Sequence, residues 1–187
     1  MTDLAETQRL PQLEYVGDAT PFASRLHSMI GYSPLFEQFS LAEIRLMGHF
    51  MHVYRAQAGQ EILREGEPGD FMMIVIEGRV EVFKQDQWNA PRLIAVIEEG
   101  KTVGEMSMID GEPRFATCIA IEPTLIAVLS ADYLARIILE QPILGAKVLM
   151  QLTLMLSQRL RQTSERLLDY LDKQRVLAEQ VQGPGFV

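Results

Sequence analysis

The sequence predicts an α+β fold that is mainly β: a jelly-roll β-barrel of about eight strands with short N-terminal helices and a long C-terminal dimerisation helix. Short runs of β-forming residues, broken by glycines at positions 59, 66, 69 and 78, extend from about residue 53 to residue 130. A helix-start pattern precedes these runs, and apolar residues spaced three and four apart follow them. We therefore divide the chain into an N-terminal arm and helix (1–32), a barrel with flanking helices (33–141), and the long helix with its tail (142–187).

Composition and charge limit the classes of function. Hydrophobic residues make up 48% of the 187 residues, enough to bury a core, and no apolar run reaches the ~18 residues of a membrane span. The N-terminus lacks the regions of a signal peptide, and the single cysteine fits a reducing compartment, so we expect a cytoplasmic location. The net charge of −8, with no basic cluster, leads us to expect no DNA partner.

The N-terminal region carries two helix-start patterns. Residues 1–20 are expected to form a flexible or partner-dependent arm. Ser33-Pro34 is typical of a helix start, and a second short helix is predicted from Leu41 to Phe50. Ser40 is a favoured N-cap residue for that helix, and Glu43 three residues later completes a capping box.

From Val53 the apolar pattern changes to alternation. Glu77-Gly78 lies between two alternating runs, Met72–Ile76 and Arg79–Phe83, and predicts a tight hairpin. The further predicted strands are Arg92–Glu98, Thr117–Ile121 and Thr124–Ser130. Many short strands with glycine turns are typical of a sandwich or a jelly-roll barrel.

The C-terminal part is helical. Ala131–Glu140 predicts one helix that Pro142 stops, and a long helix follows from about Ile143 to Gln182. At 1.5 Å per residue it spans about 60 Å, so we expect part of it to project and to need a partner, most simply in a parallel homodimer. The alternative is packing back on its own barrel, which would use only the first turns. The apolar seam comprises Leu149, Leu152, Leu156, Leu160, Thr163, Leu167, Tyr170, Gln174, Leu177 and Val181.

One short segment, GEMSMIDGEPRFATC from Gly104 to Cys118, holds a glutamate and an arginine among apolar, Gly and Pro residues. Arg114 offers a planar fork with a permanent charge, and Glu105 can accept a hydrogen bond from a hydroxyl. A short helix at about Met106–Ile109 would aim N–H groups at an anion. Gly104 lets the backbone approach closely. The segment therefore predicts a site for a small ligand that has both a hydroxyl group and a negative charge.

Three stretches resemble the cyclic-nucleotide-binding domain of the cyclic-AMP receptor protein family and of cyclic-nucleotide-dependent kinase regulatory subunits. AGQEILREGEPGDFMMIVIEGRVEVF is similar to the glycine-punctuated hairpin region, VGEMSMIDGEPRFATC to the phosphate-binding cassette, and LRQTSERL to the dimer helix of the receptor protein. The resemblance runs from Ser33 to about Leu171. It implies cyclic AMP as the ligand, with cyclic GMP less favoured.

The resemblance also implies the ligand-binding residues. Arg114 would neutralise the cyclic phosphate, and Glu105 would hold the free ribose 2′-hydroxyl. Thr163 would meet the base in its own subunit, and Ser164 would reach it from the partner; the alternative for both is polar spacing in a coiled coil. The implied cassette residues are Gly104, Glu105, Met106, Ser107, Arg114, Phe115 and Ala116.

Phe115 departs from the family pattern, in which Ala, Ser or Thr follows the arginine. A Thr at this place contacts guanine in relatives that prefer cyclic GMP, so Phe115 favours cyclic AMP. The ring could stack on the purine, contributing ~1–3 kcal/mol, or it could fill the pocket and exclude nucleotide. We favour stacking because Glu105 and Arg114 both remain. Met106 and Ser107, where Leu-Ala is usual, are milder departures.

These observations predict a dimeric cyclic-AMP sensor that passes ligand occupancy through the long helix to an effector protein of unknown identity. An enzyme is not expected, because no nucleophile–base pair or second catalytic carboxylate accompanies Glu105. No cofactor or metal is expected either, since His49 and His52 have no third ligand nearby. Two alternatives remain: a dimeric scaffold without nucleotide, in which Glu105 pairs with Arg114, and a transcription-factor sensor domain lacking its DNA-binding half.

Overall fold

The computed structural model describes residues 10–181. The chain divides into two compact units between Gln151 and Leu152. The first unit contains every strand and the short helices. The second unit is the greater part of the C-terminal helix. Residues 1–9, which belong to the predicted N-terminal arm, and residues 182–187 lie outside the described part.

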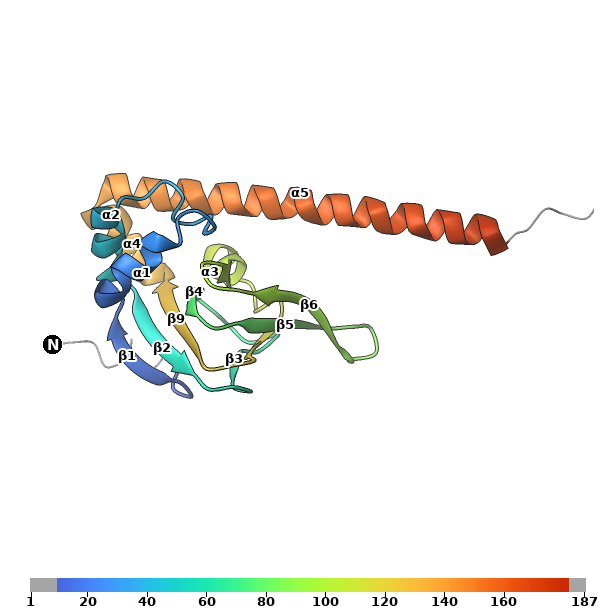
Figure 1. Ribbon diagram of the computed structural model, residues 1–187, viewed down its shortest axis with the longest axis horizontal. Helices are drawn as coiled ribbons and strands as arrows, with labels where there is room; N and C mark the ends of the chain where they lie inside the picture. Colours follow the sequence, from blue (N-terminus) through green and yellow to red (C-terminus); the bar gives the residue numbers. More distant parts are fainter. Residues whose placement is uncertain (1–9, 182–187) are drawn as a thin grey trace, which may run out of the picture. The chain divides into compact units, whose positions relative to one another are not determined.

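Within residues 10–181 the first unit holds nine strands in two antiparallel sheets (Figure 1). The five-stranded sheet has the order β1 (Glu14–Asp18), β2 (His52–Ala56), β9 (Thr124–Ser130), β4 (Phe71–Glu77) and β7 (Thr102–Val103). The four-stranded sheet has the order β3 (Glu61–Leu63), β8 (Thr117–Ala120), β5 (Val80–Gln85) and β6 (Pro91–Ile97). This arrangement confirms the mainly β jelly-roll prediction, although the two sheets do not close into a barrel.

The core lies between the two sheets. Inward side chains of the five-stranded sheet, such as Tyr54, Met73 and Ile126, form one buried cluster with Val82 and Cys118 of the four-stranded sheet. Two inner strands of the larger sheet are covered on both faces: β9 is buried along its whole length, and β4 is buried except at its last residue. Their near-continuous apolar sequences follow from this double burial.

The predicted hairpin at Glu77-Gly78 is wrong. β4 and β5 belong to different sheets, so the turn carries the chain from one sheet to the other. Gly78 has a φ of 89°, and a Cβ atom there would lie 2.6 Å from the Thr124 hydroxyl oxygen. The glycine therefore marks a tight crossing. Sequence alternation on both sides of a glycine does not say which strands pair.

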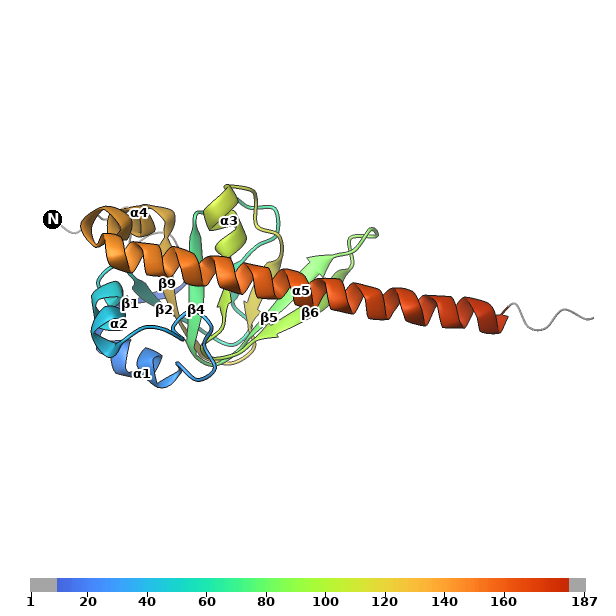
Figure 2. The same cartoon turned by 90° about the horizontal axis from the view of Figure 1, so that it is seen from above.

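The hairpin that does form joins β5 to β6, with Val80 opposite Ile97 and Gln85 opposite Pro91. Asp86 shapes its turn, because its Oδ1 accepts hydrogen bonds from the main-chain N–H groups of Trp88 (2.9 Å) and Ala90 (3.0 Å). Figure 2 shows this hairpin extending beyond the neighbouring strands of the first unit.

The N-terminal region differs from its prediction in two ways. Residues 14–18 of the expected arm form β1, which pairs with β2. The helix expected from Ser33 is absent from the described chain, where residues 34–38 form turns. The helices that form are a short 3₁₀ turn, η2 (Thr20–Phe22), followed by α1 (Ala23–Ser28). A five-residue strand that is exposed along almost its whole length has too weak an apolar pattern to be found in the sequence.

Helix α2 (Leu41–Gly48) confirms the predicted capping box: the Glu43 N–H donates to Ser40 Oγ, and Glu43 Oε2 accepts from the Ser40 N–H. The helix ends at Gly48, slightly before the predicted end at Phe50. A Cβ atom on Gly48 would lie 2.9 Å from the Thr20 nitrogen, so this glycine permits close packing on η2.

Helices α4 (Ala131–Glu140) and α5 (Pro142–Val181) follow β9, close to their predicted ranges. Pro142 ends α4 and becomes the first residue of α5, a position where its missing N–H costs nothing. The start of α5 belongs to the first unit. There Gly145 packs against Ile138, and the Lys147 ammonium bonds both carboxylate oxygens of Glu43 at 2.8 and 2.9 Å.

The remainder of α5 forms the second unit. Of its predicted seam, Leu152 is buried and Leu156 is half-buried, whereas Leu160, Leu167 and Tyr170 are exposed. The side chains of Leu177 and Val181 lie outside the described part. No helix within residues 10–181 is long and apolar enough to cross a membrane.

Candidate functional site

The charged segment singled out in the sequence forms a helix and an extended stretch at one end of β4. Helix α3 (Glu105–Asp110) confirms the predicted short helix and lies beside β4 (Figures 1 and 2). Gly104 precedes it with a φ of 89°, and Gly111 ends it with a φ of 73°. These left-handed conformations favour glycine at both ends. They place Glu105 in the first turn of α3 and return the chain to Arg114.

Arg114 is almost fully buried, with 4% of its surface exposed. Its Nη1 donates to the main-chain carbonyls of Phe71 (2.8 Å) and Gly104 (3.0 Å). The guanidinium carbon also lies 4.2 Å from the centroid of the Phe71 ring. β4 and the start of α3 thus fix the guanidinium plane. We call Arg114 together with Gly69, Phe71 and Gly104 the Arg114 seat.

Two glycines make room for this side chain. A Cβ atom on Gly69 would lie 2.0 Å from Arg114 Nε, and one on Gly104 would lie 2.8 Å from Nη1. Real Cβ atoms do not approach other heavy atoms so closely, so any side chain at position 69 would displace the arginine. The sequence marked Gly69 only as a strand breaker. Its contact with Arg114 depends on a fold that brings together residues far apart in the chain.

The main chain around Arg114 is also fixed. The Gly66 N–H donates to the Arg114 carbonyl (2.9 Å), and the Arg114 N–H donates to the Glu67 carbonyl (2.8 Å). One residue earlier, the Glu65 N–H donates to the Thr117 hydroxyl oxygen (3.0 Å). The turn after β3 therefore holds the cassette strand in place, and the orientation of Arg114 does not rest on its side chain alone.

One nitrogen of this guanidinium lacks a hydrogen-bond acceptor within residues 10–181. Nη2 of Arg114 is buried, and no group among the described residues accepts a hydrogen bond from it. A buried donor without an acceptor normally costs free energy, so such groups are rare in folded proteins. Burial lowers the pKa of Arg114, while the nearby carboxylates of Asp70 and Glu105 oppose that shift. The ordinary pKa is so high that the group stays cationic at neutral pH.

Glu105 is still more deeply buried, with 1% of its surface exposed. Its Oε1 accepts a hydrogen bond from the hydroxyl of Thr102, itself buried at the end of β7. Thr102 was not singled out from the sequence, because a threonine in a short strand carries no signal of this role. The hydrogen bonds of Arg114 go to main-chain carbonyls, so the two charged groups do not simply neutralise each other by bonding.

The other cassette residues divide by exposure. Ser107 and Ala116 are buried, whereas Met106 is exposed on the outer side of α3. Phe115 has 54% of its surface exposed, and its ring lies under the Lys84 ammonium, whose nitrogen is 4.7 Å from the ring centroid. The phenyl ring is therefore not packed into the protein interior.

Thr163 and Ser164, the predicted base contacts, lie on α5 in the second unit and are exposed. The Thr163 hydroxyl donates to the Arg159 carbonyl at 2.8 Å, and the Ser164 hydroxyl donates to the Leu160 carbonyl at 2.9 Å. Such back-bonding to the preceding turn is common for hydroxyl side chains in helices. It leaves the oxygen lone pairs available as acceptors.

Cys118, the single cysteine, lies on β8 in the buried core near the seat. Burial raises the pKa of its thiol to about 12; the charge of Arg114 opposes this shift, and Glu105 adds to it. The group is a neutral thiol at physiological pH and behaves as a small apolar side chain. It therefore offers no thiolate chemistry to a ligand in the seat.

His49 and His52, which were not expected to form a metal site, contact other groups. Among the described residues, no group of three or more His, Cys, Asp or Glu side chains could hold a metal ion. His52 instead makes edge contacts with the Tyr15 and Tyr133 rings, at centroid distances of 5.6 and 5.2 Å. His49 Nδ1 lies 3.1 Å from the Arg45 carbonyl.

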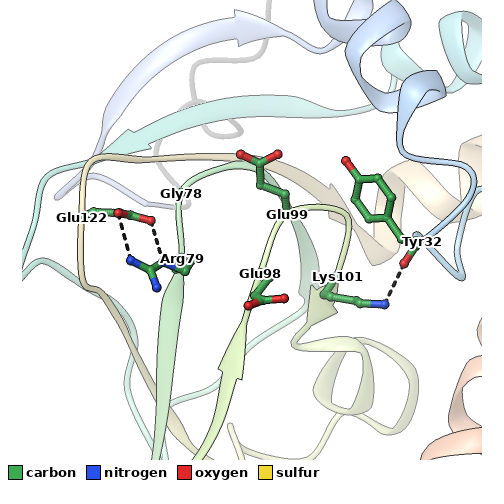
Figure 3. A pocket seen from close by; sticks show the side chains of 7 residues that line it. All are labelled: Tyr32, Gly78, Arg79, Glu98, Glu99, Lys101 and Glu122. Carbon is green, nitrogen blue, oxygen red and sulfur yellow. Dashed lines mark hydrogen bonds and ion pairs between the residues drawn. The ribbon is translucent and has the colours of Figure 1, made fainter.

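A separate hollow of about 580 Å³ lies at the other end of β4 (Figure 3). Both of its cations already have partners. Arg79 donates to both carboxylate oxygens of Glu122, at 2.9 and 3.3 Å, and Lys101 donates to the Tyr32 carbonyl at 2.7 Å. This hollow therefore lacks the unmatched cation that distinguishes the Arg114 seat. Its lining residues are Tyr32, Gly78, Arg79, Glu98, Glu99, Lys101 and Glu122.

Comparison with known proteins identifies a protein family that shares these features. Residues 54–141 match the model of the cyclic nucleotide-binding domain. A cyclic nucleotide-binding domain from Methylobacillus flagellatus KT, known from its crystal structure, is 37% identical with a TM-score of 0.77, covering 86% of this chain and 90% of that one.

Two curated relatives match over shorter ranges. The cyclic AMP receptor protein of Thermus thermophilus is 32% identical over 106 residues, which is 56% of this chain and 49% of the relative. A cGMP-dependent protein kinase of Eimeria tenella is 31% identical over 103 residues, which is 55% of this chain and 10% of the kinase. This chain thus spans half or less of the length of these relatives. With the fold, the cassette and the similarity to the Methylobacillus domain in agreement, the chain belongs to the cyclic nucleotide-binding domain family.

Proposed function

We propose that this protein is a cyclic-AMP sensor, a regulator and not a catalyst, which binds the nucleotide at the Arg114 seat and transmits its occupancy through α5 to an effector protein. The observation that carries the proposal is the buried Nη2 of Arg114, which finds no acceptor among the described residues. A fixed guanidinium with an unused donor is matched to an anion that brings its own oxygen atoms. A cyclic phosphate carries one negative charge, and one arginine neutralises it.

Glu105 supplies the second contact in this proposal. A 3′,5′-cyclic nucleotide has one free ribose hydroxyl, at the 2′ position, and a buried carboxylate held by Thr102 is a preorganised acceptor for it. The N–H groups in the first turn of α3 add donors toward the phosphate, because Gly104 has no side chain with which to cap them. Phosphate and sugar would thus be bound by two separately fixed charges.

The base distinguishes cyclic AMP from cyclic GMP. Phe115 has no polar group with which to bond the guanine amine, so the proposal favours adenine. The exposed ring supports stacking over obstruction, because a ring filling the pocket would be expected to be buried. Thr163, with Ser164 of a second copy, would contact the adenine edge through hydroxyl oxygens that can accept from its amine.

Transmission is proposed to use a parallel homodimer through α5. Leu160, Leu167 and Leu171 are each more than half exposed in the single chain, although burying each would be favourable. These residues recur at helical spacings, as an interface between paired helices requires. A ligand contacting both the cassette and the paired helices would shift their arrangement by its differential affinity for the two states.

Replacing Arg114 by alanine tests the site. The Arg114→Ala variant should bind cyclic AMP at least about 30-fold more weakly, a loss of more than about 2 kcal/mol, because the buried phosphate loses its cation. Isothermal titration calorimetry measures the affinity, and circular dichroism checks that the variant is folded. An unchanged affinity in the folded variant would reject the seat as the phosphate site.

A ligand panel tests the identity of the nucleotide. A ligand that binds only the folded state raises the midpoint of thermal unfolding. We expect cyclic AMP to raise it most, cyclic GMP less, and cyclic di-GMP not at all. No rise with any of the three would contradict the sensor and leave a dimeric scaffold as the remaining function.

A further inference from the structure

The charged groups beside Phe115 extend the site to a second strand. The ring carries the Lys84 ammonium over one face, 4.7 Å from its centroid. Lys84 comes from β5, which pairs with β8, the strand that follows the cassette. An ammonium over an aromatic face is attracted by the π-electrons of the ring. The contact therefore restrains a side chain that would otherwise rotate in solvent.

Lys84 is itself held in place. Its Nζ bonds Glu65 Oε1 at 2.6 Å, and Glu65 Oε2 accepts from the main-chain N–H of Gln85 at 2.9 Å. The Lys84 and Glu65 side chains are 35% and 19% exposed, so both are partly shielded from water. The hydrogen bond from Lys84 lowers the pKa of Glu65, which keeps this carboxylate charged. Glu65 also bonds Thr117 through its N–H, so the assembly is joined to the cassette strand.

We infer that Lys84, anchored by Glu65, is a positioning residue for purine recognition. It occupies one face of the Phe115 ring and thereby orients the opposite face to stack on the base of the cyclic nucleotide. This inference rests on the proposed function. It assigns to the site a residue about 30 positions away in sequence, and it explains how a phenylalanine at this place can serve binding: a restrained ring loses less conformational freedom when the base arrives.

The arrangement also predicts selectivity by base. Stacking increases with the size of the base, so a purine should gain more from a fixed ring than a pyrimidine. Lys84 should therefore affect cyclic AMP more than cyclic UMP, which shares the phosphate and ribose and has a smaller base. A direct electrostatic effect on the phosphate would instead weaken both ligands equally.

A double-mutant cycle measured by calorimetry tests the inference. Lys84→Met should weaken cyclic AMP binding about two- to fivefold, the range of an exposed cation–π contact, and cyclic UMP binding by less than twofold. Phe115→Ala should weaken cyclic AMP binding about fivefold or more, the lower end for loss of a stacked base. In the Phe115→Ala background, Lys84→Met should have no further effect. Lys84→Arg, which keeps the cation and the Glu65 partner, should restore binding.

Lys101→Met is the matched control. It removes the same charge at the other end of β4, so it reports any long-range effect of net charge on an anionic ligand. Equal losses for Lys84→Met with and without Phe115, equal losses for cyclic AMP and cyclic UMP, or wild-type affinity in Lys84→Met would each overturn the inference while leaving the proposed function intact. A wild-type protein that binds no cyclic nucleotide would overturn both.

Discussion

Two arginines at opposite ends of β4 show two ways in which this fold accommodates a guanidinium group. Arg114 lies beside Phe71, where the strand begins, and Arg79 follows Gly78, just beyond its end, about 20 Å away along the strand. Both are close to glycines and carboxylates. The side chain of Arg79 is 51% exposed, and it donates two hydrogen bonds to Glu122. Arg114 is buried and bonds main-chain carbonyls, with one nitrogen left over.

Under the proposed function, this difference separates a charge with a structural role from a charge available to a ligand. At Arg79 the pair raises the pKa of the arginine and lowers that of Glu122, as mutual stabilisation requires. At Arg114 burial lowers the pKa, so the folded protein holds a cation in a place that disfavours charge. Exposure of an arginine is therefore a poor guide to function here. The useful criterion is whether the fold has already supplied all its acceptors.

The largest expected losses of stability and affinity come from a substitution that displaces Arg114 from its seat. Gly69→Ala places a Cβ atom 2.0 Å from Arg114 Nε, so the arginine must move and its carbonyl contacts must break. We expect a loss of about 1–3 kcal/mol in the free energy of unfolding, as for overpacking, and at least a 30-fold loss of cyclic-AMP affinity. Urea unfolding and calorimetry measure the two quantities.

Gly31→Ala is the control for this substitution. Neither Gly31 nor Gly69 has a left-handed conformation, and a Cβ atom on Gly31 meets nothing within 4 Å. The control variant should keep both stability and affinity. If Gly69→Ala bound cyclic AMP as well as Gly31→Ala does, the fixed position of the guanidinium would be irrelevant to binding, and the contrast between the two arginines would lose its functional meaning.

A change of intermediate size in the free energy of unfolding is expected at a partly exposed ion pair. Lys147 bonds Glu43 between the start of α5 and α2, and their side chains are 27% and 30% exposed. The Lys147 hydrogen bond, followed by the Ser40 N–H, lowers the pKa of Glu43 from 4.5 to about 2. Because the folded-state pKa is the lower one, the pair stabilises fully above about pH 4.5 and loses its contribution as the pH falls toward about 2.

Glu43→Gln isolates this charge, since glutamine can still complete a capping box. At pH 7 we expect the variant to be about 1–2 kcal/mol less stable, after allowance for solvent screening of a pair that remains partly exposed. The difference from wild type should shrink between pH 4.5 and pH 2.5 in urea unfolding experiments. A difference that stays constant across that range would show that the pair does not couple to protonation of Glu43.

Much of the architecture could be predicted because it is encoded locally. The Ser40–Glu43 capping box, the strand Thr124–Ser130 and the helix Ala131–Glu140 follow from short-range patterns, and the structure confirms each. The incorrect predictions concern the pairing of strands. Gly78 was expected within a hairpin, but its strands belong to different sheets. β1 was missed because its exposed residues have a weak apolar pattern, so only its pairing with the distant β2 defines it.

The candidate site was predictable in part for the same reason. Gly104, Glu105 and Arg114 lie within one short segment, so its spacing alone indicated an anion site. Gly69 and Phe71 were not predictable as members, because each reaches the segment only through the fold. Thr102 is three residues from Glu105 in the chain, but a threonine in a short strand carries no signal of its role. The role of Lys84 likewise depends on β5 lying beside β8. Sequence spacing identified the charged groups, whereas the fold determines which of their hydrogen bonds are already made.

The smallest effect is expected from removing Arg79. Arg79→Ala removes an exposed pair, and such pairs contribute little because water and salt already screen both charges. We expect the midpoint of thermal unfolding to change by no more than about 2 °C, and cyclic-AMP affinity to stay within about twofold of wild type. Glu122→Gln should behave in the same way, since either change breaks the pair. A large loss of affinity in Arg79→Ala would mean that the two ends of β4 are coupled, and that an arginine already paired with a carboxylate can still contribute to ligand binding.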